Sequence, residues 1–217
     1  MRHSLIQFAL ASTLGLFAAA AQADTVVYDN GSPDHASGNN LGFALQAEDF
    51  RLTVQARLTT IEFWTLEAAD AYRGSISYEI RWNAGGALGA SILQGTAAVT
   101  RTATGTYQGL TEYHNSFDLP SPLLMDPNPY WLILHNGGLD NFTDPNEFLW
   151  ETAAMQPGQL GGAEAFSQGG PFTPNFQEHA FRISAVPEPC PAFALVAGLG
   201  VLAALGRRGA AARRRPQ

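Results

Sequence analysis

Two turn-rich segments carry oxygen donors of the kind that hold a hard cation. Asp126 lies in one segment, and Asp140, Asp144 and Glu147 lie in the other. Ca²⁺ is bound by about six to eight oxygen ligands from carboxylates and carbonyls, so these four residues are our hypothesis for a structural Ca²⁺ site. Their spacing is not that of an EF-hand loop. Asp also favours turns for local reasons, by bonding nearby backbone groups, and that is the alternative interpretation.

A tryptophan beside a carboxylate suggests contact with a sugar. In the run "LTTIEFWTL", period-two alternation predicts that Ile61 and Phe63 face the core, while Glu62 and Trp64 share the opposite face. An exposed indole can stack on a sugar ring. The alternative is that a loop or a second sheet covers Trp64, since buried tryptophan is the commoner case. We expect the other tryptophans of the body in the core, namely Trp82, Trp131 and Trp150.

The sequence contains no motif for hydrolysis. The body has four histidines and several serines, but neither a G-x-S-x-G elbow nor an H-E-x-x-H zinc motif. Glu48 and Asp49 are adjacent on an expected strand and would point to opposite faces, which is poor geometry for glycoside cleavage. We therefore predict that the protein is not an enzyme, with a hydrolase as the weaker alternative. The histidines are His35, His114, His135 and His179.

Alternating apolar residues predict strands throughout the chain between its two ends. The run "SISYEIRW" places Ile76 and Ile80 on one face and Glu79 and Arg81 on the other. Similar runs recur between segments rich in Gly, Asn, Asp and Pro, and none shows helical periodicity. We predict an all-β body over residues 24–186, an antiparallel β-sandwich of jelly-roll type. The apolar positions switch parity in "FALQAEDFRLTV", which predicts a bulge or bend near Glu48 and Asp49.

The predicted body is acidic and has no cysteine. It contains six arginines and no lysine against eighteen Asp and Glu residues, a net charge of −12. A nucleic-acid partner would require a basic patch, so we expect none. Without cysteine the body has no disulfide, and its stability must come from packing or from a bound metal ion.

The N-terminal segment predicts export. It has a short basic start at Arg2 and His3, continues with the apolar run from Leu5 to Ala20, and ends in an A-x-A site at Ala21 and Ala23. This order is that of a secretory signal peptide, so residues 1–23 would be removed by signal peptidase and Asp24 would become the mature N-terminus.

The C-terminal segment predicts a membrane helix with a basic flank. An apolar stretch over about 191–206 is short for a bilayer span, which needs about 17 to 25 residues. Five arginines follow it, as expected on the cytoplasmic side of a membrane segment, so the body would lie outside the inner membrane. These are Arg207, Arg208, Arg213, Arg214 and Arg215.

The C-terminal segment contains three features in order: Val186-Pro187-Glu188-Pro189, the apolar stretch and the arginines. This order resembles the PEP-CTERM sorting signal of Gram-negative bacteria that make extracellular polysaccharide. The resemblance covers residues 187–217 and implies that an exosortase acts at the Pro-Glu-Pro motif. The same tail is also described as an ice-binding protein C-terminal domain, which implies nothing about the body. Cys190, directly after the motif, departs from the pattern, and we interpret it as a small apolar residue at the membrane boundary.

The body also resembles exported jelly-roll-like proteins that carry this tail, through "TTIEFW", "NPYWLILHNGG", "FLWET" and "AFRIS". This implies a β-sandwich and little about activity. We expect an exported protein, transiently membrane-anchored and then located at the cell surface or in the extracellular matrix, with a structural or adhesive role. The alternative is a carbohydrate-binding module for extracellular polysaccharide, with Ca²⁺ as a candidate cofactor.

Overall fold

The computed structural model describes residues 24–154 and 161–186. The expected signal peptide with Ala21 and Ala23 lies outside the described residues. So do Pro187–Gln217, which include most of the expected sorting motif, Cys190, the apolar stretch and the five arginines. Among the described residues, no helix is long and apolar enough to cross a membrane.

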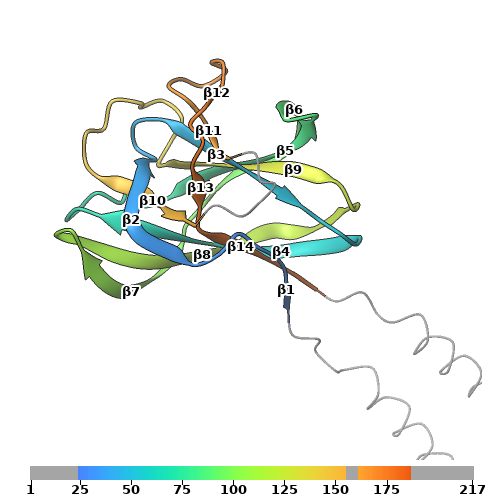
Figure 1. Cartoon of the computed structure of the whole chain (residues 1–217), viewed down its shortest axis with the longest axis horizontal. Helices are drawn as coiled ribbons and strands as arrows, with labels where there is room; N and C mark the ends of the chain where they lie inside the picture. The colour runs from blue at the N-terminus through green and yellow to red at the C-terminus, as the bar shows by residue number, and fades with distance from the viewer. Residues whose placement is uncertain (1–23, 155–160, 187–217) are drawn as a thin grey trace, which may run out of the picture. The chain divides into compact units, whose positions relative to one another are not determined.

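The described chain is all-β and forms two antiparallel sheets, which confirms the predicted all-β class and the antiparallel pairing (Figure 1). In the eight-stranded sheet, β4 pairs with β8 along its length, and its other edge is shared between β14 and β10. The strands of this sheet are β1 (Thr25–Asp29), β2 (Pro33–Asn40), β4 (Ala56–Glu67), β7 (Thr100–Tyr107), β8 (Leu110–Met125), β10 (Phe148–Ala153), β13 (Glu178–His179) and β14 (Phe181–Val186).

The six-stranded sheet has the order β12-β11-β3-β9-β5-β6. Its members are β3 (Leu45–Arg51), β5 (Ile76–Ala84), β6 (Ala87–Ala97), β9 (Pro129–Asn136), β11 (Ala163–Ala165) and β12 (Thr173–Pro174). Successive strands of the chain pass repeatedly between the two sheets, so the arrangement is sandwich-like (Figure 1).

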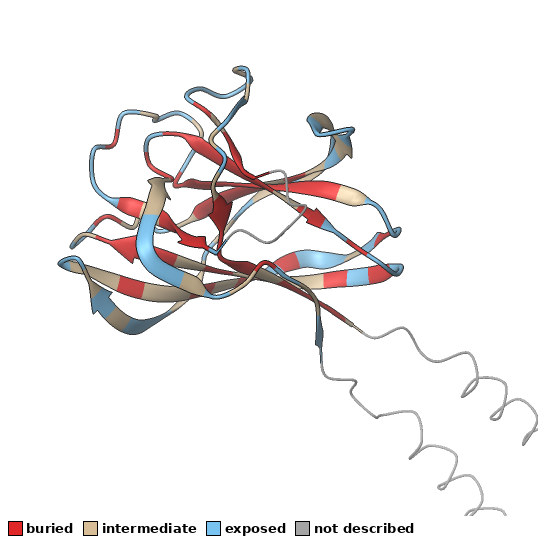
Figure 2. Ribbon diagram, viewed as in Figure 1, coloured by how far each residue is buried: buried red, intermediate tan, exposed pale blue. Residues whose placement is uncertain are grey.

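The main core lies between the sheets and follows the alternation of the sequence. Ile61 and Phe63 are fully buried on the inner face of β4, as predicted. Phe50 of β3 and Trp150 of β10 belong to the same core cluster. The outermost strands β6 and β7 contain no buried residue and are tan and blue in Figure 2. Burial of the apolar faces thus holds the two sheets together.

The predicted bulge in β3 is wrong. Its pairing with β9 is continuous from Gln46 to Arg51, without a shift of register. The apolar positions change parity because this sheet is covered on both sides. Phe50 faces the main core, whereas Ala47 belongs to a second apolar cluster with Trp131. Strand β11 extends that second face beside β3, and Leu139, Phe142 and Phe172 pack against it.

Two other details differ from the expectations. The segment "PDHASGNN", rich in turn-forming residues, forms strand β2 against β10, because β10 offers it an unpaired edge. Trp82 lies near the end of β5 and is 42% exposed, packing against Tyr130 rather than in the core. Trp131 and Trp150 are buried, as expected.

Candidate functional site

The four residues of the hypothetical Ca²⁺ site do not come together. Asp126 precedes β9 and Asp140 follows it, so this eight-residue strand separates them by about 25 Å. Asp144 is buried and accepts a hydrogen bond from the Arg73 guanidinium, which lowers the pKa of the carboxyl group. Asp140 and Glu147 are exposed in the same connection. Asp144 therefore already has a cationic partner, and a Ca²⁺ site remains a prediction.

Glu62 and Trp64 lie side by side on the outer face of β4, as the alternation predicts. Glu62 Oε2 is 3.2 Å from His114 Nε2. The His114 ring stacks on the indole at 4.7 Å, and the Arg182 guanidinium lies 5.1 Å from the indole centroid. His114 comes from β8 and Arg182 from β14, on either side of β4. Because these neighbours approach the indole from both sides, Trp64 is half-buried rather than a free flat platform.

A cluster that the sequence analysis did not predict lies on the same outer face. Glu112 of β8 pairs with Leu66 of β4, and Leu66 pairs in turn with Leu149 of β10. Leu66 shares the outer face of β4 with Trp64, and Glu151 lies two residues after Leu149 on the same face of β10. Glu112 and Glu151 therefore both lie on the outer side of the sheet, one on each side of β4. His35 Nδ1 of β2 is 2.7 Å from Glu112 Oε2 and 3.1 Å from Glu151 Oε1.

A local irregularity in β2 brings His35 to the two carboxylates. Gly38 pairs with Glu151 and Pro33 with Ala153, so residues 34–37 face Thr152 alone. Within this bulge His35 has φ 57°, a left-handed conformation that is uncommon outside glycine. The Thr152 hydroxyl fills the bulge and lies 2.8 Å from Asp34 Oδ1 and 2.9 Å from the Ser37 carbonyl oxygen.

The two carboxylates are buried and the imidazole is not. The side chains of Glu112 and Glu151 are 5% and 0% exposed, and that of His35 is 40% exposed. Burial, and next the negative charge of Glu112, raises the pKa of Glu151 to about 7. The cluster can therefore hold a proton or a cation, but a sugar or peptide cannot lie between its carboxylates.

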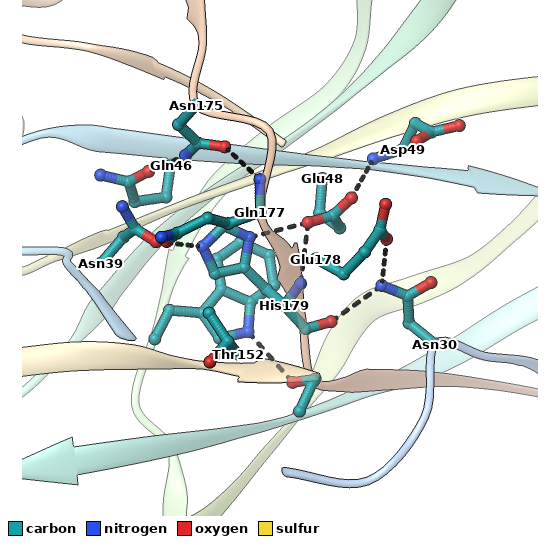
Figure 3. A network of polar contacts seen from close by, with 12 residues as sticks. Asn30, Asn39, Gln46, Glu48, Asp49, Thr152, Asn175, Gln177, Glu178 and His179 are labelled. Carbon is teal, nitrogen blue, oxygen red and sulfur yellow. Dashed lines mark hydrogen bonds and ion pairs between the residues drawn. The ribbon is translucent and has the colours of Figure 1, made fainter. Parts of the chain in front are cut away.

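A second carboxylate–histidine group lies inside the sandwich (Figure 3). His179 of β13 is fully buried, its Nδ1 lies 2.7 Å from Glu48 Oε2, and its Nε2 lies 3.0 Å from Asn39 Oδ1. Burial lowers the pKa of His179 to about 3. Burial, and next Glu178, raises the pKa of Glu48 well above its usual value. His179 is thus neutral near pH 7, burial disfavours the ionised form of Glu48, and the network joins β3 of one sheet to β13 of the other.

Two adjoining hollows of about 590 and 620 Å³ lie over the outer face of the six-stranded sheet. They share Arg81 and Phe172 in their lining, and Trp131 and Phe176 line the first. Phe176 is 70% exposed and has φ 58°. The ring is thus held in solvent at the rim of a hollow that Arg81 also lines, with the Arg81 guanidinium paired to Glu79 at 2.9 Å.

The turn around Phe176 is fixed by its neighbours. Gly162 N donates to the Gln177 carbonyl oxygen at 2.6 Å, and Asn175 N donates to the Gly162 carbonyl oxygen at 2.9 Å. A left-handed backbone at a bulky residue costs about 1–3 kcal/mol and persists only where surrounding contacts enforce it. Such strain is a reason to consider Phe176 a functional residue.

No protein-family model matches the chain, and no curated protein sequence is significantly similar to it. The geometry of the described residues therefore carries the functional interpretation. Of the residues singled out from the sequence, Glu62 and Trp64 meet as predicted. The sites of His35 and Phe176 were not predicted from the sequence, because each is assembled from segments that are far apart along the chain. The only local signals were a histidine and a phenylalanine within Gly-, Asn- and Pro-rich segments.

Proposed function

We propose that the chain is an exported, non-catalytic cell-surface or extracellular-matrix protein with a structural or adhesive role. Signal peptidase would remove residues 1–23, and an exosortase would act at the Pro187-Glu188-Pro189 motif while the apolar stretch and its arginines hold the chain in the inner membrane. The body would then be released or re-anchored outside that membrane. We also propose that the body is of the jelly-roll type, which the repeated passage of the chain between two antiparallel sheets supports.

The boundary of the body supports this proposal. Strand β14 ends at Val186, the first residue of the sorting motif. It pairs with β4 through that residue, since Val186 lies opposite Arg57. Processing after Val186 would therefore leave every described strand with its pairing partner. A non-catalytic role is supported by the burial of the carboxylate groups, because substrate cannot reach Glu48 or Glu151.

Altering the sorting motif in the native host tests this proposal. We expect Glu188→Ala to shift the protein from the surface and medium fractions to the inner-membrane fraction, measured by quantitative immunoblotting. The matched control is Glu147→Ala, at an exposed position within the body, which should not change the distribution. An unchanged distribution for Glu188→Ala would contradict sorting through this motif.

Carbohydrate binding is the second candidate, and the geometry of Phe176 favours it. An exposed aromatic ring in a fixed turn, beside a hollow that contains Arg81, offers both stacking and hydrogen bonding to a sugar. The sequence analysis placed this contact at Glu62 and Trp64, where His114 and Arg182 already flank the indole. We therefore place the proposed sugar contact at Phe176 first and at Trp64 second.

Matched alanine variants separate the two surfaces. We expect Phe176→Ala to lower binding of the full chain to the host polysaccharide by about tenfold, since loss of one stacking contact removes about 1–1.5 kcal/mol. Trp64→Ala tests the other surface, and Val54→Ala, at a side chain that is 61% exposed, is the control. A Ca²⁺ requirement would appear as loss of binding with chelator. If none of the variants changed binding, or if no polysaccharide bound, carbohydrate recognition at these surfaces would be excluded.

A further inference from the structure

We propose that His35, Glu112 and Glu151 bind one divalent transition-metal ion, with Zn²⁺ as the reference ion. One ligand atom from each residue lies within 4.8 Å of the other two. The three side chains come from β2, β8 and β10, so the site joins three strands of one sheet. This inference goes beyond the proposed function and does not depend on the sorting signal.

The first support is that buried carboxylate oxygens lack hydrogen-bond donors. With both carboxylates ionised, Glu151 Oε2 is buried without a hydrogen-bond partner, and Glu112 Oε2 has only its contact with His35 Nδ1 at 2.7 Å. A buried carboxylate oxygen without a hydrogen-bond donor is destabilising, so such groups require an explanation. The nearest donor is His35 Nδ1, which carries at most one proton and lies close to both carboxylates. One N–H cannot satisfy the two side chains together.

The second support is the balance of charge. Two ionised carboxylates carry a charge of −2, and a protonated His35 supplies only +1, which leaves one negative charge in a buried site. A divalent cation with a neutral imidazole cancels the charge completely. The competing arrangement is a proton shared by the two carboxylates, and it requires no metal. The two arrangements differ in whether added metal stabilises the protein.

The ligand types select the class of metal. Ca²⁺ and Mg²⁺ prefer oxygen ligands alone, whereas imidazole suits Zn²⁺ and its neighbours among the transition metals. Ligand atoms about 2.0–2.1 Å from a tetrahedral zinc lie about 3.3 Å from one another. The 2.7 and 3.1 Å separations from His35 Nδ1 therefore need to open by only a few tenths of an ångström. Since His35 is exposed, water can occupy the fourth position.

Neighbouring groups already orient two of the ligands. The Tyr107 ring stacks on the His35 imidazole, with 4.0 Å between centroids and an interplanar angle of 7°. The Thr104 hydroxyl donates a hydrogen bond to Glu112 Oε1 and leaves Oε2 directed at His35. Outer contacts of this kind fix ligands and raise metal affinity. Both residues belong to β7, so this edge strand would be tied to the site through its contacts with the ligands.

Zinc titration of the full-length chain in detergent tests the proposal. All variants would carry Cys190→Ser, so that a thiol cannot contribute a competing ligand. We expect one equivalent of Zn²⁺ to bind by calorimetry and to raise the Tm, whereas Ca²⁺ and Mg²⁺ have no effect at the same concentration. Co²⁺ in place of Zn²⁺ should give the visible absorption of a tetrahedral ion.

Three variants locate the site. Glu151→Gln keeps the shape of the side chain and should weaken Zn²⁺ binding by about tenfold or more. His35→Ala removes an exposed side chain and should do the same with an unchanged far-ultraviolet spectrum, so the test survives if Glu151→Gln fails to fold. Glu62→Gln is the matched control. Glu62 also lies beside a histidine, His114, at 3.2 Å, but that pair contains a single carboxylate. Absence of saturable one-to-one binding, or equal affinity of the His35→Ala chain, would overturn the proposal.

Discussion

His179 and His35 each lie beside carboxylates, but in opposite surroundings. His179 is fully enclosed, so burial favours its neutral form and also disfavours the ionised form of Glu48 beside it. His35 is exposed and faces two carboxylates that are enclosed. The first arrangement therefore serves to join the two sheets, whereas the second leaves a negative site that is open to a cation from one side.

The burial of His179 predicts a dependence of stability on pH. Its pKa is lowered from 6.5 to about 3, so its contribution to the free energy of unfolding is fully present above pH 6.5 and is lost as the pH falls towards 3. In that range the contribution changes by about 1.4 kcal/mol per pH unit. The raised pKa of Glu48 acts in the opposite direction, since its contribution is present below pH 4.5 and declines as the pH rises.

Two measurements separate these contributions. By NMR, the ring signals of His179 should not titrate between pH 8 and pH 5, in contrast to an exposed histidine. The difference in unfolding free energy between the unaltered chain and His179→Gln should rise with pH up to about 6.5 and stay constant above it. A His179 signal that titrates near pH 6.5 would show that the ring is not enclosed.

At the scale of elements, period-two alternation predicted the strands whose two faces differ. It placed Ile61 and Phe63 in the core and Trp64 on the opposite face of β4. The alternation did not predict strands that lack one face towards the core and one face towards solvent. Strand β3 is apolar on both faces because both are covered. Segment β2 forms a strand although its residues are polar, because backbone pairing with β10 holds it in place. Neither cause is visible within the segment itself.

Strand β2 approaches β10 too closely to accept a side chain at Gly38. A Cβ atom there would lie 2.7 Å from the Trp150 carbonyl oxygen and 2.8 Å from Leu149 Cβ. We expect Gly38→Ala to displace β2 and to lower the unfolding free energy by about 1–3 kcal/mol, measured by denaturant unfolding. Because His35 lies on the same strand, Zn²⁺ affinity should fall as well. Ser32→Ala, exposed and just outside β2, is the control, and equal stability of the two variants would contradict the close approach.

At the scale of the whole molecule, a cysteine-free body is held together by an apolar core and by polar ties between strands. The core and the Glu48–His179 network join the two sheets, and the His35 cluster joins three strands of one sheet. The all-β class was predictable from alternation and composition, because both depend on near neighbours in sequence. The clusters of His35 and of Phe176 were not, because their residues meet only after the sheets have formed.

The last strand of the body ends at Val186, where the proposed sorting motif begins. Terminal peptide mapping by mass spectrometry, on membrane, surface and medium fractions of the native host, tests this most directly. We expect a mature protein that starts at Asp24, ends between Val186 and Pro189, and occurs in the surface or medium fraction. A chain that is intact through Gln217 and confined to the inner membrane would contradict the account and identify a tail-anchored periplasmic domain instead.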